Sequence, residues 1–122
     1  MRRFRHLSLL CLLLALACCG KQGRPTVIAG GDAERGRIAI ERYGCVACHV
    51  IPGIPNFGSN VGPPLDGIAR RAYIAGVLAN KPEEMVRWLR DPPRVNPLTV
   101  MPDMGIPEAE AKDIAAYLYT LD

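Results

Sequence analysis

The sequence predicts an all-α domain, and three observations support this prediction. At 122 residues the chain is long enough for one domain, because single domains cluster near about 100–150 residues. Several segments place apolar residues at helical spacing between residues that begin and end helices. The proline- and glycine-rich connections, residues 52–64 and 92–105, lack the alternation of a strand. We therefore expect about four helices.

The first helix is predicted from about Asp32 to Tyr43. Asp32 can cap its amino end, since a short polar side chain accepts hydrogen bonds from the first turn. Gly36, Ile40 and Tyr43 lie on one stripe of this helix. Gly44 follows, and glycine commonly ends a helix.

Two less regular segments are predicted to be helical in the middle of the chain. A short turn covers residues 65–71 and continues loosely through residues 73–78. A clearer helix opens at residues 82–84, because a proline followed by two acids suits a first helical turn. Its apolar stripe holds Met85, Trp88 and Leu89. Two consecutive prolines at residues 92–93 end it.

The last helix has the most regular stripe in the sequence. It opens at residues 107–108 and carries its acidic residues early, where they favour the helix dipole. Its predicted buried residues are Ile114, Tyr117, Leu118 and Leu121.

The amino terminus is typical of an export signal. Arg2, Arg3 and Arg5 precede an apolar run at residues 7–17 that ends in small residues. This run is roughly half of the ~20 apolar residues that cross a bilayer, so a permanent transmembrane helix is the weaker interpretation. We therefore predict a signal peptide over residues 1–17.

Residues 14–20, which include the end of this signal, resemble a bacterial lipoprotein box, in which a small residue precedes the cysteine that is acylated. Ala17 before Cys18 fits best, and Cys19 is the alternative site. A cleaved signal with incidental cysteines is the other interpretation. We expect residues 18–30 to form a lipidated cysteine and flexible tether, and residues 31–122 to form the domain.

The charge balance bears on the kind of partner that the protein binds. Three of the fifteen Lys and Arg residues lie in the predicted signal, whereas all twelve Asp and Glu residues follow it. The mature protein is therefore near neutral. Net charge gives no support for nucleic acid or an anionic membrane surface as a partner.

Cys45, Cys48 and His49 form a Cys-x-x-Cys-His motif, the attachment signature of c-type haem. Its thiols add to the porphyrin and its histidine binds the iron. A zinc site would need a second ligand pair, but the other histidine, His6, lies in the predicted signal. A redox dithiol would be expected in an alternating strand and helix pattern, which is absent. We therefore expect one covalent haem c with its iron, which would also complete a small core.

The sixth position of the iron decides between electron transfer and ligand chemistry. Met85 lies on a helical stripe and is better suited to core packing. Met101 and Met104 lie in the proline-rich loop, and Pro102 restricts the backbone of Met101. A thioether ligand would raise the potential and leave no site for a substrate. The residues alone leave Met101 and Met104 as candidates.

From about Gly31 to Asp122 the domain resembles class I, mitochondrial-type monohaem cytochromes c. Four features beyond the haem motif carry the resemblance. They are Gly36 and Ile40 facing Tyr117 at a crossing of the first and last helices, Gly62-Pro63-Pro64-Leu65, the helix at residues 85–92, and Pro97-Leu98-Thr99-Val100-Met101.

The resemblance implies roles for several residues. The Pro63 carbonyl would accept the other ring nitrogen of His49. Trp88 would pack on the methionine side of the haem. The loop with Thr99 favours Met101 over Met104 as the sixth ligand.

The same matching makes Arg71 a candidate partner of a haem propionate, with Arg70 and Tyr73 as neighbours that could substitute. A solvated surface is the alternative interpretation of the two arginines. The lysine-rich face of mitochondrial cytochromes is not evident here, which leaves the docking charge open.

The function implied is that of a single-electron carrier in a bacterial respiratory chain, not an enzyme with a small-molecule substrate. Its redox partner would be a membrane oxidase or dehydrogenase, and it could be a subunit of such a complex. A haem-based sensor with a labile sixth ligand is the alternative. We expect a lipid-anchored protein on the periplasmic side of a bacterial membrane, or otherwise a soluble periplasmic one.

Overall fold

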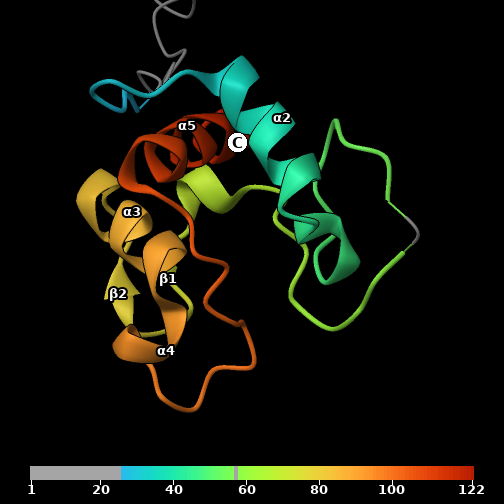
Figure 1. The fold of residues 1–122 in the computed structure, drawn as a ribbon, viewed down its shortest axis with the longest axis vertical. Coiled ribbons are helices and arrows are strands. Elements are labelled where there is room, and N and C mark those ends of the chain that lie inside the picture. The colour runs from blue at the N-terminus through green and yellow to red at the C-terminus, as the bar shows by residue number, and fades with distance from the viewer. Residues whose placement is uncertain (1–25, 57) are drawn as a thin grey trace, which may run out of the picture.

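The computed structural model describes residues 26–56 and 58–122, most of whose regular structure is helical (Figure 1). In chain order the helices and 3-10 turns are α2 (Ala33–Arg42), η2 (Cys45–Ala47), η3 (Ile68–Arg70), α3 (Pro82–Arg90), α4 (Pro92–Val95) and α5 (Glu108–Leu118). Two short strands, β1 (Tyr73–Ile74) and β2 (Leu78–Ala79), lie between η3 and α3. The predicted helical class is confirmed, with one local exception.

The exception is the segment 73–78, where the predicted helical continuation is wrong. The two strands pair antiparallel, and the Val77 amide donates to the Ile74 carbonyl (3.0 Å) to close the turn. The two central residues of the turn, Ala75 (φ 50°) and Gly76 (φ 73°), are both left-handed. Consecutive left-handed residues suit a tight hairpin and cannot continue a right-handed helix.

The two prolines after α3 end that helix as predicted, but the chain then makes one more helical turn. This turn is α4, which the sequence analysis did not predict. The Asp91 carboxylate accepts from the Arg94 amide (3.0 Å) and so caps it. Proline fits the first turn because its missing N–H would have had no helical partner.

Helices α2 and α5 pack against each other, as Figure 1 shows. Asp32 caps α2 by accepting from the Arg35 amide (2.8 Å), as predicted. At the crossing, a Cβ on Gly36 would lie 2.0 Å from the Asp113 carbonyl oxygen. Tyr117 lies one turn further along α5, where its hydroxyl donates to the Pro52 carbonyl (2.7 Å).

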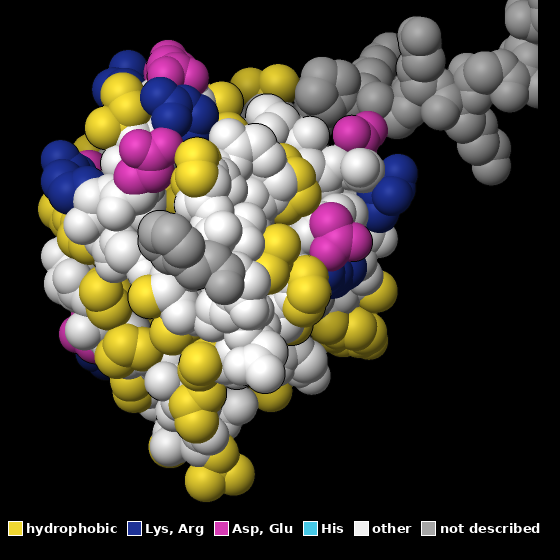
Figure 2. All heavy atoms as spheres, turned by 90° about the vertical axis from the view of Figure 1, so that its right-hand side faces the viewer, with side chains coloured by type: hydrophobic (Ala, Val, Ile, Leu, Met, Phe, Trp, Pro, Cys, Tyr) yellow, Lys and Arg dark blue, Asp and Glu magenta, His cyan; other side chains and the backbone are white. Residues whose placement is uncertain are grey.

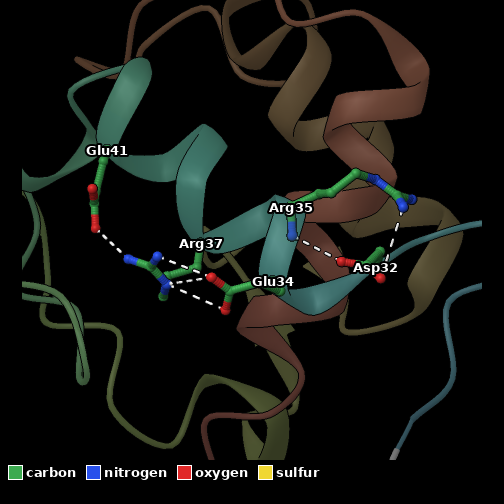
Figure 3. Close-up of polar contacts among 5 residues, drawn as sticks. All are labelled: Asp32, Glu34, Arg35, Arg37 and Glu41. Atoms are coloured by element: carbon green, nitrogen blue, oxygen red, sulfur yellow. Dashed lines mark hydrogen bonds and ion pairs between the residues drawn. The ribbon is translucent and has the colours of Figure 1, made fainter.

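The opposite side of α2 is exposed, and its charges pair with one another. Figure 3 shows Arg37 between Glu34 and Glu41, with N–O distances of 2.9 Å and 2.6 Å. These residues are three and four positions apart, the spacings at which helical side chains meet. Such exposed pairs add little to the stability of the helix, because water and salt screen them.

The core lies between α2, α3, α5 and the segment that follows η2. Met85 is buried in this core, as predicted. Ile28 is also buried, so packing begins within the segment predicted as a tether. The core residues are Ile28, Ala39, Ile40, Ile51, Ile54, Ile68, Ile74, Met85, Val86, Trp88, Leu89, Ile106, Ala111, Ile114, Ala115, Leu118 and Tyr119.

The predicted signal peptide and both candidate lipidation sites, Cys18 and Cys19, lie outside the described residues. Among residues 26–56 and 58–122, no helix combines the length and the apolar character needed to span a bilayer.

Tyr119 should make stability depend on alkaline pH. It is buried, its hydroxyl donates to Asn80 Oδ1 (2.7 Å), and burial, with a smaller effect of Glu83, raises its pKa to about 12. An unfolded tyrosine ionises near pH ~10, so its contribution is complete below that pH and is lost as pH rises toward ~12. Urea unfolding should show this loss in the parent protein and a smaller loss in Tyr119→Phe. Equal pH slopes for the two proteins would contradict the assignment.

Candidate haem-binding site

The Cys-x-x-Cys-His motif begins just after α2. Gly44, in the left-handed conformation (φ 68°), turns the chain, and η2 follows immediately. Within this turn the His49 amide donates to the Cys45 carbonyl (2.9 Å). Cys45 and Cys48 are half-buried free thiols. The local fold therefore presents two unpaired thiols and an imidazole within one short segment.

The environment of Cys45 argues against a redox dithiol. Burial raises the pKa of the Cys45 thiol, and the neighbouring Cys48 adds to this increase. Reactive cysteines of disulfide oxidoreductases have a lowered pKa, because the thiolate is the nucleophile. Cys45 therefore stays a thiol at neutral pH.

His49 is held on one side by the backbone of Pro63. Its Nδ1 lies 2.8 Å from the Pro63 carbonyl oxygen. A carbonyl can only accept, so Nδ1 carries the hydrogen and Nε2 keeps the lone pair that can bind a metal. The structure thus brings together two residues that the sequence analysis linked only by resemblance. Such a contact fixes the orientation of a metal-binding imidazole.

Gly62 packs directly against the His49 ring, a contact that the sequence analysis did not predict. A Cβ on Gly62 would lie 2.4 Å from Cε1 and 2.6 Å from Nδ1 of that ring. The Gly62 amide also donates to the Cys48 carbonyl (2.8 Å), which ties this loop to the motif. The signal in the sequence is only a glycine before two prolines.

Gly62→Ala should therefore displace the imidazole. We expect about tenfold weaker histidine–iron binding, the scale seen when a supporting contact of a metal ligand is lost. Absorption spectra of the purified holoprotein should show a high-spin fraction that the parent lacks. Pro64→Ala, an exposed change on the same loop, is the control and should resemble the parent. A Gly62→Ala spectrum identical to the parent's would contradict the proposed packing role.

Met101 lies in the loop after α4, half-buried against the core. Its amide donates to Thr99 Oγ1 (3.1 Å), and the Thr99 amide donates to the Asn96 carbonyl (3.0 Å). The Asn96 side chain also accepts from the Leu98 amide (3.1 Å). The role of Asn96 was not predicted from the sequence, although asparagine side chains commonly accept hydrogen bonds in such turns. Met104 is 40% exposed.

Trp88 is buried on α3, within the core. Cys45 and Met101 both pack against this same core from outside it. The attachment motif and the methionine loop therefore border one apolar interior.

Arg71 and Tyr73, the candidate propionate neighbours, differ in their placement. The Arg71 guanidinium donates to the carbonyls of Pro64 (2.6 Å) and Asp66 (2.9 Å), beside the His49 loop. Within the part of the chain that the structure describes, it forms no ion pair with a carboxylate. Tyr73 is 62% exposed. Asn80, not singled out in the sequence, donates to the Arg71 carbonyl (2.8 Å) and fixes this segment.

Comparison with known proteins identifies the family. The family model described as cytochrome c matches residues 33–122. The chain belongs to the cytochrome c family. With its Cys-x-x-Cys motif, this cytochrome c domain carries a covalent haem c and transfers electrons.

The residues present fit that cofactor. Cys45 and Cys48 are unpaired thiols, and the Pro63 contact leaves Nε2 of His49 as the metal-binding nitrogen. Met101, half-buried against the same core, carries a soft thioether of the kind that haem iron accepts.

Two relatives and one solved structure show how far the similarity extends. Cytochrome c oxidase subunit 2 of Alkalihalophilus pseudofirmus is 36% identical over 92 residues, which is 73% of this chain and 25% of that protein. Cytochrome c-552 of Bradyrhizobium diazoefficiens is 30% identical over 117 residues, 95% of each chain. Cytochrome c2 of Rhodobacter sphaeroides has a TM-score of 0.53 at 23% identity and covers 75% of this chain and 96% of its own. The last comparison shows a shared fold.

Proposed function

We propose that this cytochrome c is a single-electron carrier of a bacterial respiratory chain, with His49 and Met101 as the axial iron ligands. The observation that carries the proposal is the hydrogen bond from His49 Nδ1 to the Pro63 carbonyl (2.8 Å). Cys45 and Cys48 would form the thioether bonds to the haem.

When bound, haem c supplies an iron that gains and loses one electron. The chain's own part is to keep the surroundings of that iron constant. Pro63 holds the His49 ring, and hydrogen bonding at Nδ1 increases the basicity of Nε2. Thr99 anchors the backbone of Met101, and buried Trp88 contributes to the apolar interior. Two fixed ligands leave little to rearrange between oxidation states.

The partner we favour is a terminal oxidase, with a membrane dehydrogenase as the alternative donor. The relative from Alkalihalophilus pseudofirmus is named as a cytochrome c oxidase subunit 2, and this chain matches only a quarter of it. A carrier tethered near such an enzyme gains from a high effective concentration. Acylation of Cys18, or of Cys19, would supply that tether on the periplasmic side of the membrane.

Mass spectrometry of the mature protein from isolated membranes tests the cofactor and the anchor together. We expect one haem mass on the peptide that contains Cys45 and Cys48, and acyl chains on an amino-terminal cysteine. Cys18→Ser should release the protein from the membrane fraction, and Cys19→Ser is the matched control. Retention of haem without acyl chains would support the soluble alternative. A protein without haem mass would overturn the proposed function.

The same membranes test the proposed partner. The reduced holoprotein should drive oxygen consumption by membranes stripped of their own cytochrome c, and cyanide should stop it. The absence of any oxygen consumption would argue for the dehydrogenase side of the chain instead.

A further inference from the structure

The two segments that hold the proposed iron ligands carry no acidic side chain and no lysine or arginine. No Asp, Glu, Lys or Arg occurs from Gly44 to Leu65, which includes His49, or from Val95 to Pro102, which includes Met101. The whole chain has fifteen basic and twelve acidic residues, so this gap is marked. We call residues 44–56, 58–65 and 95–102 the uncharged loops.

The uncharged loops also expose apolar side chains. Leu98 is 90% exposed, Val100 is 82% exposed, and Val61 is 62% exposed. In Figure 1 these loops form the right-hand and lower margins of the molecule. Figure 2 shows the right-hand side, where charged side chains lie in the upper half and at the margins, and hydrophobic side chains are spread over the face among uncharged atoms. Leu98 and Val100, two positions apart and both almost fully exposed, place apolar surface where a partner can cover it.

The charges of the protein are concentrated on other elements. The ion pairs among the described residues join side chains of α2, α3 and α5 and the cap of α2, as Figure 3 shows for α2. Arg71, at the edge of the uncharged loops, donates to the Pro64 carbonyl (2.6 Å). The loops therefore differ from the helical faces in both charge and polarity.

We propose that the uncharged loops are the docking surface for the redox partner, and that the partner presents an apolar, uncharged patch to them. This inference rests on the proposed function, because a carrier that holds haem iron through His49 and Met101 would exchange electrons with a partner that docks on the loops around these two residues. A charged partner patch would lose its hydration against Leu98 and Val100 and find no opposite charge there. An apolar patch has no charge hydration to lose, and the burial of these side chains against it is favourable.

Docking of this type predicts association that salt hardly changes. Charge-steered partners associate much more slowly when salt screens them, because the Debye length falls from about 30 Å at 0.01 M to about 3 Å at 1 M. Here the loops contribute no acidic or basic side chain for salt to screen, and the chain after the predicted signal is near neutral.

Electron self-exchange measures the salt dependence of docking without the need to identify the redox partner. The probe is a second copy of the holoprotein in the other oxidation state, whose uncharged loops are the matching apolar patch. We expect the NMR self-exchange rate to change less than about twofold between ~0.01 M and ~1 M salt. Leu98→Lys and Val61→Lys should each slow it about tenfold at low salt, with recovery at high salt, because like charges then face each other. Ile38→Lys, 51% exposed on α2, is the matched control and should exchange like the parent.

Two results would overturn the docking surface. One is a parent rate that changes more than about tenfold with salt, as charged surfaces produce. The other is equal self-exchange in Leu98→Lys and Ile38→Lys. Failure of the proposed function looks different, since the parent holoprotein would then lack reversible one-electron reduction or the methionine–iron absorption band. The docking proposal would fall with it.

Discussion

Met101→Ala should lower the reduction potential of the holoprotein by more than about 0.1 V, because a thioether ligand favours ferrous iron and axial ligands set the potential over about 0.8 V. The weak absorption band of methionine–ferric ligation, near the red end of the spectrum, should disappear. Carbon monoxide should bind readily at the vacated position. Potentiometric titration and absorption spectra measure all three effects.

Met104→Ala is the matched control for this change. Met104 lies three residues further along the same loop and is 40% exposed, whereas Met101 is half-buried and braced by Thr99. Its replacement should leave the potential, the band and the resistance to carbon monoxide unchanged. The opposite result would make Met104 the ligand. If neither change alters the spectrum and the parent binds carbon monoxide, the sensor interpretation replaces electron transfer.

The helices could be predicted because their signals are local. Asp32 before α2, the Pro-Glu-Glu start of α3 and the apolar stripe of α5 each determine structure within a few residues. The hairpin could not be predicted in this way. Ala75 adopts a left-handed conformation that its own type disfavours, so only the packing of the surrounding chain selects it.

The same distinction between local and long-range signals applies to the site. Cys45, Cys48 and His49 lie within five consecutive residues and could be found from their spacing. Gly62 and Asn80 act on residues in other parts of the chain, on the His49 ring and on the Arg71 carbonyl respectively. No local pattern encodes such contacts. They became visible only once the loops were placed in three dimensions.

Gly36→Ala should destabilise the holoprotein by about 3 kcal/mol, the upper part of the range for overpacking a tight contact. The new Cβ would lie 2.0 Å from the Asp113 carbonyl oxygen and 3.0 Å from the Ile114 amide nitrogen, so α2 and α5 must separate. Alanine favours a helix by about 1 kcal/mol over glycine, so the steric cost of the new Cβ must exceed the expected loss by that amount. Guanidinium unfolding followed by circular dichroism measures it.

The two helices cannot separate easily at this crossing, because the Asp113 side chain on α5 is hydrogen-bonded to the first turn of α2 and its cap. Its carboxylate accepts from Arg35 Nε (2.9 Å) and Nη2 (2.8 Å), and from the Asp32 amide (2.8 Å). The Arg35 hydrogen bonds hold the pKa of this carboxyl below its usual range. Ala109→Gly, exposed in the first turn of α5, measures helix propensity alone and should cost less than the ~1 kcal/mol of a helix interior. If Gly36→Ala were as stable as the parent, the close crossing of α2 and α5 would not be what requires glycine there.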